Sequence, residues 1–244
     1  MHKHAVQQLF EQRQARSTKP FVARGGRVQR CPQCRVDRQF CICPLRPTAQ
    51  SNAAFVLLYY DDEVLKPSNS GRLIADLFPD TFAYIWQRTT VEQDLLTLLQ
   101  DPAWLPMVVF PEEYAAPDRL ICQPTALDLQ GRRPLFILLD GSWREAKKMF
   151  RKSPYLDAFP VWSVAPTGPS GYQVRKAAKD VQLATAEVAA TVLAQLGETT
   201  NAALLHAWFD LFGYRYQMGV KRLNQGDAGA EARLLTLIHG RNPA

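Results

Sequence analysis

The sequence of 244 residues predicts an α/β protein with a mainly parallel sheet and a small cysteine-rich module at its N-terminus. Two observations predict the sheet: short apolar runs alternate with helical patterns, and polar clusters follow several of those runs. The third observation is that four of the five cysteines lie within thirteen residues. We expect residues 1–50 to form the N-terminal module and residues 51–244 to form the α/β domain.

The N-terminal segment is strongly basic. Residues 3–16 have the apolar spacing of a helix, and residues 1–46 hold ten Lys and Arg against two acids. That segment carries +8, so the rest of the chain carries −2 of the net charge of +6. A basic arm on a nearly neutral body is typical of a protein that binds a phosphate backbone, and a solvated basic tail is the alternative. Since the sequence shows no signal peptide and no run of about 18 apolar residues, we expect a cytoplasmic protein without membrane contact.

Cys31, Cys34, Cys41 and Cys43 have the spacing C-x2-C-x6-C-x-C. A tetrahedral Zn²⁺ needs four thiolates within coordination distance, and two short cysteine pairs on facing turns supply them. Disulfides are disfavoured in a reducing compartment, so the alternative is free or redox-active thiols. Because four protein ligands leave no coordination position open, the predicted zinc is structural. The isolated Cys122 is expected to be a small buried hydrophobe.

Beyond residue 53 the pattern alternates between strands and helices. Short apolar runs that end in polar or Pro-containing segments predict strands, and longer segments with apolar residues at helical spacing predict helices. The expected strands are 54–60, 81–86, 107–110, 134–139 and 161–165. The expected helices are 71–78, 91–100, 143–150, 179–196 and 200–223. Residues 61–68 are expected to be a loop, and residues 111–132 form a long connection of the kind that usually carries function.

Asp140, Gly141 and Ser142 lie where the fourth expected strand gives way to a helix. Ser142 is a candidate N-cap, and Glu145 three residues later completes a capping box. Such a tripeptide often does no more than cap a helix. Two features point to a functional site instead. Ligand sites in open α/β sheets lie beyond the carboxyl ends of strands, and Trp143 directly after the turn needs something to pack or stack on.

Polar residues also follow the other expected strands, and parallel strands would bring them to one edge of the sheet. Taken singly, Lys66, Arg72 and Arg175 fit ordinary surface charges. The prediction of a functional site therefore rests on their shared position at one edge of the sheet. The clusters are 66–70 with Arg72, then Arg88, 111–113 and 170–176.

Together these motifs resemble the DTW-domain family of RNA-modifying enzymes, specifically its bacterial tRNA-uridine aminocarboxypropyltransferases. The matching segments are the four cysteines, Lys-Pro-Ser-Asn-Ser at 66–70, Leu-Leu-Asp-Gly-Ser-Trp-Arg-Glu-Ala-Lys-Lys-Met at 138–149 with Arg151 and Ser153-Pro154, Ser-Gly-Tyr at 170–172 with Arg175, and Leu-Ala-Thr-Ala-Glu at 183–187. They follow the family's order. Ser142 stands where the motif usually has Thr but keeps the hydroxyl, and residues 183–187 match the family less fully.

The resemblance implies a SPOUT-like α/β fold with a knotted C-terminal region that binds S-adenosylmethionine near the knot. It further implies transfer of the 3-amino-3-carboxypropyl group to N3 of a uridine in the variable loop of tRNA. Arg88 and Arg175 are candidates for the carboxylate of the donor's methionine part. The residues expected to bind the donor are Pro111, Glu112, Leu139, Asp140, Ser170, Tyr172 and Arg175.

The expected catalytic residues are Asp140, Ser142 and Trp143. Uridine N3–H is a weak acid, so the attacking nitrogen has to lose its proton, and Asp140 is the candidate general base if its surroundings raise its pKa. The alternative is that Asp140 fixes the N3–H or the donor's amino group without taking a proton. Trp143 would stack on uracil or adenine, or else pack in the core under the turn. Ser142 is expected to cap and position rather than to react.

The tRNA backbone would be held by basic and polar side chains, with an affinity that falls as salt rises. The expected residues are Arg24, Arg27, Arg30, Arg35, Arg38, Lys66, Asn69, Arg72, Lys147 and Arg151. For the basic residues after Trp143 the alternative is an ordinary solvated helix face. Two other functions stay open: a SPOUT-type RNA methyltransferase, and a zinc-containing RNA-binding module without catalysis. A monomer is the working expectation.

Overall fold

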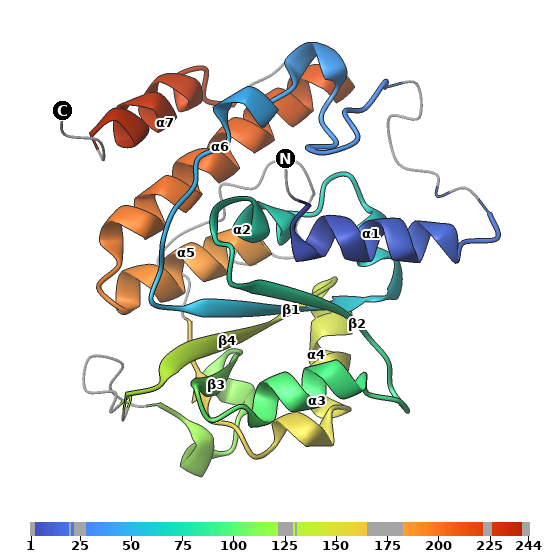
Figure 1. Ribbon diagram of the computed structural model, residues 1–244, viewed down its shortest axis with the longest axis vertical. Helices are drawn as coiled ribbons and strands as arrows, with labels where there is room; N and C mark the ends of the chain where they lie inside the picture. Colours follow the sequence, from blue (N-terminus) through green and yellow to red (C-terminus); the bar gives the residue numbers. More distant parts are fainter. Residues whose placement is uncertain are drawn as a thin grey trace.

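The computed structural model describes residues 3–19, 21, 28–121, 129, 131–164, 183–221 and 226–240. In these ranges the chain forms a five-stranded parallel sheet with helices on both faces (Figure 1). The strands are β1 (Ala54–Tyr60), β2 (Thr81–Trp86), β3 (Trp104–Val109), β4 (Arg133–Asp140) and β5 (Val161–Trp162). The helices are α1 (Ala5–Ala15), α2 (Arg72–Leu77), α3 (Gln93–Gln100), α4 (Trp143–Arg151), α5 (Thr185–Gln195), α6 (Thr199–Lys221) and α7 (Ala230–His239). The predicted α/β class with a parallel sheet is confirmed.

The strand order β2-β1-β4-β3-β5 puts β4 in the middle of the sheet, between β1 and β3. Because the strands are parallel, their carboxyl ends meet at one edge, and the register pairs Tyr59 of β1 with Asp140 of β4. The segments that leave β1, β3 and β4 therefore start close together. This edge is where ligand sites of open parallel sheets lie.

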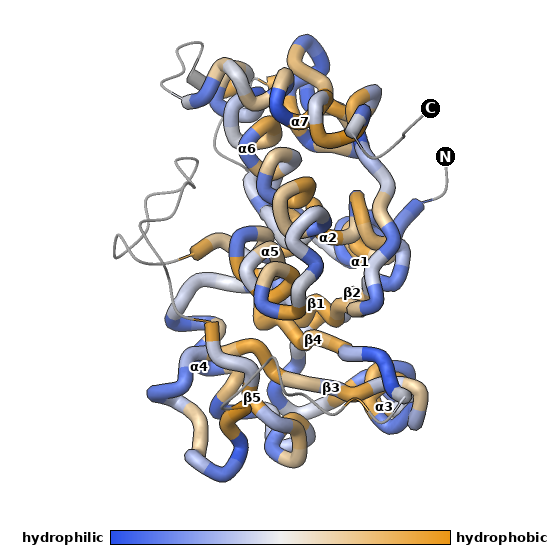
Figure 2. Tube along the Cα trace, turned by 90° about the vertical axis from the view of Figure 1, so that its left-hand side faces the viewer, coloured by the Kyte–Doolittle hydropathy of each residue, from blue (hydrophilic) through white to orange (hydrophobic). Residues whose placement is uncertain are grey.

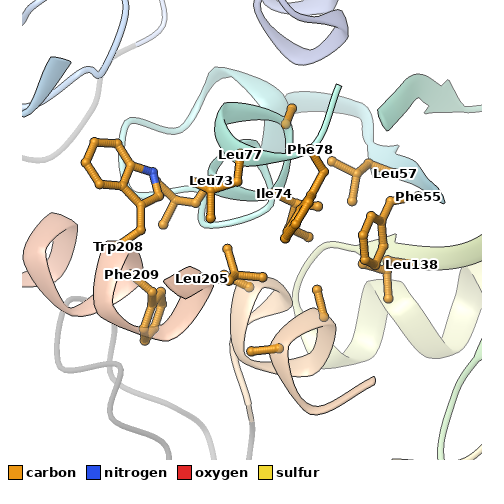
Figure 3. Packing of buried hydrophobic residues seen from close by; sticks show 14 of the residues in the cluster. Phe55, Leu57, Leu73, Ile74, Leu77, Phe78, Leu138, Leu205, Trp208 and Phe209 are labelled. Carbon is orange, nitrogen blue, oxygen red and sulfur yellow. The ribbon is translucent and has the colours of Figure 1, made fainter. Parts of the chain in front are cut away.

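Alternate residues of β1 face opposite layers of the molecule. Its odd-numbered residues from 55 to 59 share a core with α1, α2, α5, α6 and α7, whereas the even-numbered residues from 54 to 58 share one with α3 and α4. The central strands are hydrophobic along their length (Figure 2). In the larger core, Phe55 and Leu57 lie near Ile74 of α2 and Phe78, which follows that helix, with Leu205 of α6 beyond them (Figure 3). Each such side chain contributes about 1.5–3 kcal/mol on burial.

Several boundaries differ from the sequence prediction. The strand β3 begins at Trp104, because pairing of Trp104 with Arg133 extends it through Pro106, a residue that breaks the local strand pattern. The segment 61–65 is a 3₁₀ turn that buries Glu63, Val64 and Leu65 rather than an open loop. Helix α7 was not predicted, and it is held by packing against α6.

Two further predicted bounds are wrong: β5 ends at Trp162 rather than at 165, and the helix predicted from 179 is α5, which begins at Thr185. Ala184 has an extended backbone, and its N–H donates to Glu187 Oε2 at 2.7 Å, which caps the helix there. Residues 165–182 lie outside the described residues, so the knot stays a prediction.

The N-terminal module packs against the helical layer on the α2 side of the sheet. Val36 and Ile42 are fully buried and belong to the same core cluster as the helices. At Gly219 of α6 a Cβ atom would lie 2.6 Å from Cβ of Asp37, so only glycine permits this close approach of the module to the helix. The buried residues of the module therefore belong to the same hydrophobic core as the helices and the sheet face that these helices cover.

Asp76 of α2 connects α1, the module and α6. Its side chain is 6 % exposed. Its carboxylate lies 3.1–3.3 Å from four side-chain nitrogens: His4 Nε2, Arg46 Nη1, Arg72 Nη1 and Trp208 Nε1. Burial alone would raise the pKa of Asp76, but the hydrogen bond from His4 and the charge of Arg72 lower it to about 2.

We expect Asp76→Asn to lower the free energy of unfolding by about 3–5 kcal/mol, because it leaves buried cations without their counter-charge. The folded-state pKa of about 2 lies below the ordinary value of 3.8. The stabilisation is therefore fully present above about pH 4 and is lost as the pH falls from about 4 to about 2. Urea unfolding of the wild type and the variant, near neutral pH and at about pH 3, measures both effects.

Asp80→Asn is the matched control. It removes a 2.7 Å pair with Arg133 whose partners are about half exposed, and is expected to cost less than about 1 kcal/mol. Equal losses in the two variants would contradict the assignment of Asp76 as the buried junction.

Candidate functional site

The turn between β4 and α4 has the predicted form. The strand ends at Asp140, Ser142 is the N-cap, and α4 begins at Trp143. The backbone N–H of Ser142 donates to Glu145 Oε2 at 2.7 Å, and the N–H of Glu145 donates to Ser142 Oγ at 3.4 Å. The capping box is therefore confirmed, and the exposed Ser142 has a clear positioning role at the start of the helix.

Asp140 is buried, with 3 % of its surface exposed. The amide nitrogen Nδ2 of Asn69 donates to both carboxylate oxygens at 3.0 Å. The backbone of Gly71 packs directly on the acid, because a Cβ atom there would lie 2.1 Å from Asp140 Oδ2 and 2.9 Å from the Tyr59 hydroxyl. The segment around Asn69 and Gly71 thus covers the carboxylate, whereas the sequence alone suggested an acid that faces an open pocket.

Asn69 is the centre of a buried polar cluster at this edge. Its Oδ1 accepts from the backbone N–H of Arg72 at 3.2 Å and from the Tyr59 hydroxyl at 3.4 Å. Its Nδ2 also lies 3.4 Å from Glu63 Oε1, and Glu63 in turn pairs with Lys66. Burial, followed by the negative charge of Asp140, raises the pKa of Tyr59 well above its ordinary value, so the hydroxyl stays protonated. We name Tyr59, Glu63, Asn69 and Asp140 the polar cluster.

Beside the polar cluster lies a column of stacked rings. Trp143 stacks on Phe110 with centroids 5.5 Å apart, and Phe110 stacks on Phe150 at 4.3 Å. Tyr114 meets Trp143 edge-on at 5.6 Å and is 37 % exposed. The ammonium of Lys147 lies 5.6 Å from the Trp143 centroid and 5.8 Å from that of Tyr114. Trp143 therefore packs on the core through one side and stays half-buried.

A second aromatic pair borders the same turn. Tyr60 at the end of β1 stacks on Trp86 at the end of β2, with centroids 5.6 Å apart. Lys148 donates to the Tyr60 hydroxyl at 3.0 Å. A Cβ atom at Gly141 would lie 3.2 Å from Cβ of Tyr60, so the turn runs close to this pair. Lys147 of α4 thus lies over the rings of Trp143 and Tyr114, and Lys148 lies over those of Tyr60 and Trp86.

The residues predicted to bind the donor fall into two sets. Pro111 and Leu139 are half-buried and Glu112 is exposed, all at the carboxyl ends of β3 and β4 next to the ring column. Ser170, Tyr172 and Arg175 lie outside the described residues, as does Cys122. Arg88, the other candidate for the methionine carboxylate, is exposed after β2. Donor binding by these residues stays a prediction.

The residues predicted to contact RNA are not equivalent. Arg35, Asn69 and Arg72 are 1–3 % exposed and make contacts inside the protein, so their burial gives no support to a phosphate contact. Lys66 is partly exposed but paired with Glu63. Arg30 and Lys147 are half-buried, Arg38 and Arg151 are exposed, and Arg24 and Arg27 lie outside the described residues. Tyr114 was missed by the sequence reasoning, although an aromatic residue within the polar segment 111–119 was an available signal.

The four cysteines come together as predicted. Their sulfur atoms all lie within 4.8 Å of one another, and the Cys31–Cys43 and Cys34–Cys41 sulfur pairs are each 3.7 Å apart. A disulfide would bring two sulfurs to about 2.05 Å, so the thiols are separate. In a tetrahedral zinc site with Zn–S bonds of about 2.3 Å the sulfurs lie about 3.8 Å apart.

The electrostatics of the cysteine cluster also suit a cation. The pKa of Cys34 is lowered to about 5, mainly because the Cys43 thiol donates a hydrogen bond to its sulfur, whereas the pKa of Cys43 is raised by that same contact. The Cys34 thiolate therefore forms readily, while Cys41 and Cys43, whose pKa values are raised, hold their protons. A bound cation would allow all four to ionise, so the residues present fit a zinc ion.

The fold and the site define a parallel α/β domain with an attached four-cysteine module and a buried acid at the end of its central strand. The model of the DTW domain matches residues 28–217, from just before Cys31 into α6. The chain belongs to the DTW domain family. No solved structure matches the chain. Among the helices of the described ranges, none combines the length and apolar character that crossing a bilayer requires.

Proposed function

We propose that this protein transfers the 3-amino-3-carboxypropyl group of S-adenosylmethionine to N3 of a uridine in the variable loop of tRNA. The observation that carries the proposal is the arrangement of the Asp-Gly-Ser-Trp turn: Asp140 ends the central strand in a buried polar cluster, and Trp143 begins the next helix half-buried beside basic residues. Membership of the DTW domain family supports it.

The reaction is a substitution at carbon. The uridine N3 lone pair attacks the Cγ atom of the methionine part, an N3–Cγ bond forms and the Cγ–S bond breaks. The sulfonium sulfur takes the electron pair and leaves as methylthioadenosine, while the N3 proton passes to a base. The choice between this carbon and the methyl carbon is set by the orientation of the donor, which is a matter of alignment rather than of residue type.

Two roles for Asp140 fit the chemistry. As a general base it would accept the N3 proton, and since Asn69 and Gly71 cover the carboxylate, the segment that carries them would have to move when substrate binds. As a positioning residue it would hold Asn69 and the 66–72 segment in place and never meet the substrate. Burial favours the second role in the structure as it stands. Rate measurements as a function of pH separate them, as set out in the Discussion.

We assign the donor to the carboxyl ends of β3 and β4. Pro111, Glu112 and Leu139 lie there beside Asp140, and the exposed carboxylate of Glu112 is suited to accept hydrogen bonds from ribose hydroxyls. Ser170, Tyr172 and Arg175 complete the proposed set by the family resemblance. The zinc held by Cys31, Cys34, Cys41 and Cys43 would be structural, since four thiolates fill its coordination sphere.

The RNA would lie over α4 and the basic N-terminal module. The exposed residues of α4 and its C-cap are basic, and Glu145 is engaged in the capping box. The ring of Tyr114, 37 % exposed beside Trp143, is the best-placed surface for an unpaired base. Because Glu112 and Glu113 precede Tyr114 and would repel phosphate, we assign Tyr114 a contact with a base rather than with the backbone.

We expect Tyr114→Ala to weaken binding of unmodified tRNA by about five- to a hundredfold, since stacking of one base on an aromatic side chain contributes about 1–3 kcal/mol. Tyr114→Phe keeps the ring and should bind like the wild type. Fluorescence anisotropy with labelled tRNA at fixed salt measures the dissociation constants. If Tyr114→Ala binds as tightly as Tyr114→Phe, the base contact is not at this residue.

Nucleoside mass spectrometry of tRNA tests the proposed function in cells. Deleting the gene should remove aminocarboxypropyl-uridine from tRNA, and a plasmid with the wild-type gene, but not with the Asp140→Asn variant, should restore it. A methylated uridine that disappears instead would identify a methyltransferase. Unchanged nucleosides, with tRNA still bound by the purified protein, would favour the non-catalytic RNA-binding module.

A further inference from the structure

Arg35 follows a metal-ligand candidate and has an unusual backbone. Arg35 lies directly after Cys34 and has a φ of 59°. Within the described ranges, no other residue except glycine has a positive φ. The N–H of Arg35 donates to the Cys31 carbonyl at 2.9 Å, and the N–H of Cys31 donates to the Val36 carbonyl at 2.8 Å, which closes the turn that presents the two sulfurs. Positive φ favours glycine and costs another residue about 1–3 kcal/mol. The side chain of Arg35 must therefore contribute something that glycine cannot.

The side chain of Arg35 does not face solvent. It is 3 % exposed, and its guanidinium lies 3.7 Å from the centroid of the Phe10 ring of α1. Its Nη1 donates to the carbonyl oxygen of Val64 at 2.7 Å, and its Nη2 to Gln7 Oε1 at 3.4 Å. A short hydrogen bond from a buried cation to a main-chain carbonyl fixes the position of that backbone. Arg35 thus ties the cysteine turn to the segment that follows β1.

Val64 lies in the 3₁₀ turn of residues 61–65, one residue after Glu63 of the polar cluster. The carbonyl of Glu63 accepts from Lys66 N at 3.1 Å, and that of Lys66 accepts from Asn69 N at 2.9 Å. Asn69 then holds both oxygens of Asp140. A continuous series of hydrogen bonds and short backbone segments therefore joins the cysteine cluster to Asp140.

The same 3₁₀ turn is also held from α1. Arg13 donates to Asp61 at 3.0 Å and to Asp62 at 2.6 Å, but both of these acids are more than half exposed. Exposed pairs of this kind contribute little, whereas the buried contact of Arg35 with Val64 is screened from water. Arg35 is accordingly the stronger of the two restraints.

We propose that Arg35 is a positioning residue through which metal binding at the four cysteines fixes residues 61–72 over Asp140. A metal ion held by Cys31 and Cys34 sets the turn between them, the turn aims the guanidinium at Val64, and Val64 sets the turn that presents Glu63 and Asn69. Loss of the metal would release Arg35 and loosen the cover of the acid. The proposal rests on the proposed function for its catalytic consequence, but its structural part stands without it.

Hydrogen–deuterium exchange of the full-length protein, without RNA or donor, tests the link. Arg35→Gly removes the guanidinium and keeps the positive φ without strain, so the cysteine turn and its zinc should be retained. We expect the amides of residues 61–72 to exchange about ten- to a hundredfold faster in Arg35→Gly, in line with the loss of a buried charged hydrogen bond. Zinc content is measured on the same samples. Arg38→Ala is the matched control, since Arg38 lies in the same module with an exposed side chain.

Removal of zinc from the wild type with a chelator should accelerate exchange over residues 61–72 by a similar factor. In Arg35→Gly, where the contact with Val64 is already lost, chelation should cause little further acceleration over these residues. Because zinc removal also weakens the core that the module shares with the sheet, peptides from β1 and β4 measure that global part, and the expected effect is the additional acceleration over residues 61–72. The proposal is overturned if exchange rises equally throughout the chain, because Arg35 then only stabilises the fold. It is also overturned if the chelated, still folded wild type keeps its slow exchange over 61–72, a result that does not depend on the variant. Failure of the uridine reaction would leave both readouts unaffected.

Discussion

Replacing Asp140 with Asn is expected to slow uridine modification by about a hundred- to ten-thousandfold, the range found when a group that handles the transferred proton is lost. The substitution keeps the shape of the side chain, and its remaining oxygen can still accept from Asn69 Nδ2. It removes the charge at the end of β4 and replaces one of the two accepting oxygens with an amide group that donates. Single-turnover transfer to unmodified tRNA with saturating donor measures the rate.

The pH dependence of that variant decides between the two roles of Asp140. If Asp140 takes the N3 proton, the variant should regain rate as the pH rises toward the pKa of the N3–H group, because hydroxide then supplies the missing base. If Asp140 only positions Asn69 and its segment, raising the pH should not restore the rate. Asp118→Asn, an exposed acid in the segment after β3, is the control. A rate for Asp140→Asn within about threefold of the wild type would remove Asp140 from the chemistry altogether.

Replacing Cys41 with Ser is expected to abolish stoichiometric zinc binding and to lower the free energy of unfolding by at least about 3 kcal/mol, since a structural zinc binds with about 10–16 kcal/mol in isolated zinc-finger peptides. The loss should spread beyond the module, because Val36 and Ile42 are buried in the core that the module shares with α1 and α6. Metal analysis and thermal unfolding of the purified proteins measure the two effects.

Cys122→Ser serves as the control for the zinc prediction, because Cys122 is far from the other four cysteines in the sequence and should leave the zinc content at one per chain. A wild-type protein that contains no metal when purified without chelators would contradict the zinc assignment. So would a Cys41→Ser variant that retains one equivalent of metal.

Much of the fold follows from local sequence patterns. The apolar runs that became β1 and β4 are buried on both faces, so composition alone revealed them, and the capping box of Ser142 and Glu145 marked the start of α4. The start of β3 depends on pairing with Arg133, which is distant in the sequence, and α7 is held by packing against the preceding helix α6. No local pattern encodes such partners.

The sequence predicted individual residues of the candidate site, but it did not predict which of them are buried or contact one another. The sequence identified the four cysteines, Asp140 and Trp143, because each belongs to a motif with a chemical requirement. It assigned Arg35, Asn69 and Arg72 to RNA, because charge and polarity do not tell whether a side chain is buried. Burial depends on packing: Arg35 lies on Phe10 and Arg72 on Phe212, both aromatic residues distant in sequence. The pairing of Asn69 with Asp140 follows only from the sheet register and the close approach of Gly71.

The central claim is that this DTW-domain protein transfers the aminocarboxypropyl group of its donor to RNA. The most direct test incubates the purified protein with unmodified tRNA and S-adenosylmethionine that carries label either in the methyl group or in the aminocarboxypropyl carbons. The account predicts that label from the aminocarboxypropyl carbons enters the RNA on uridine N3 and that labelled methyl leaves in methylthioadenosine. Label that enters the RNA from the methyl group alone would contradict it.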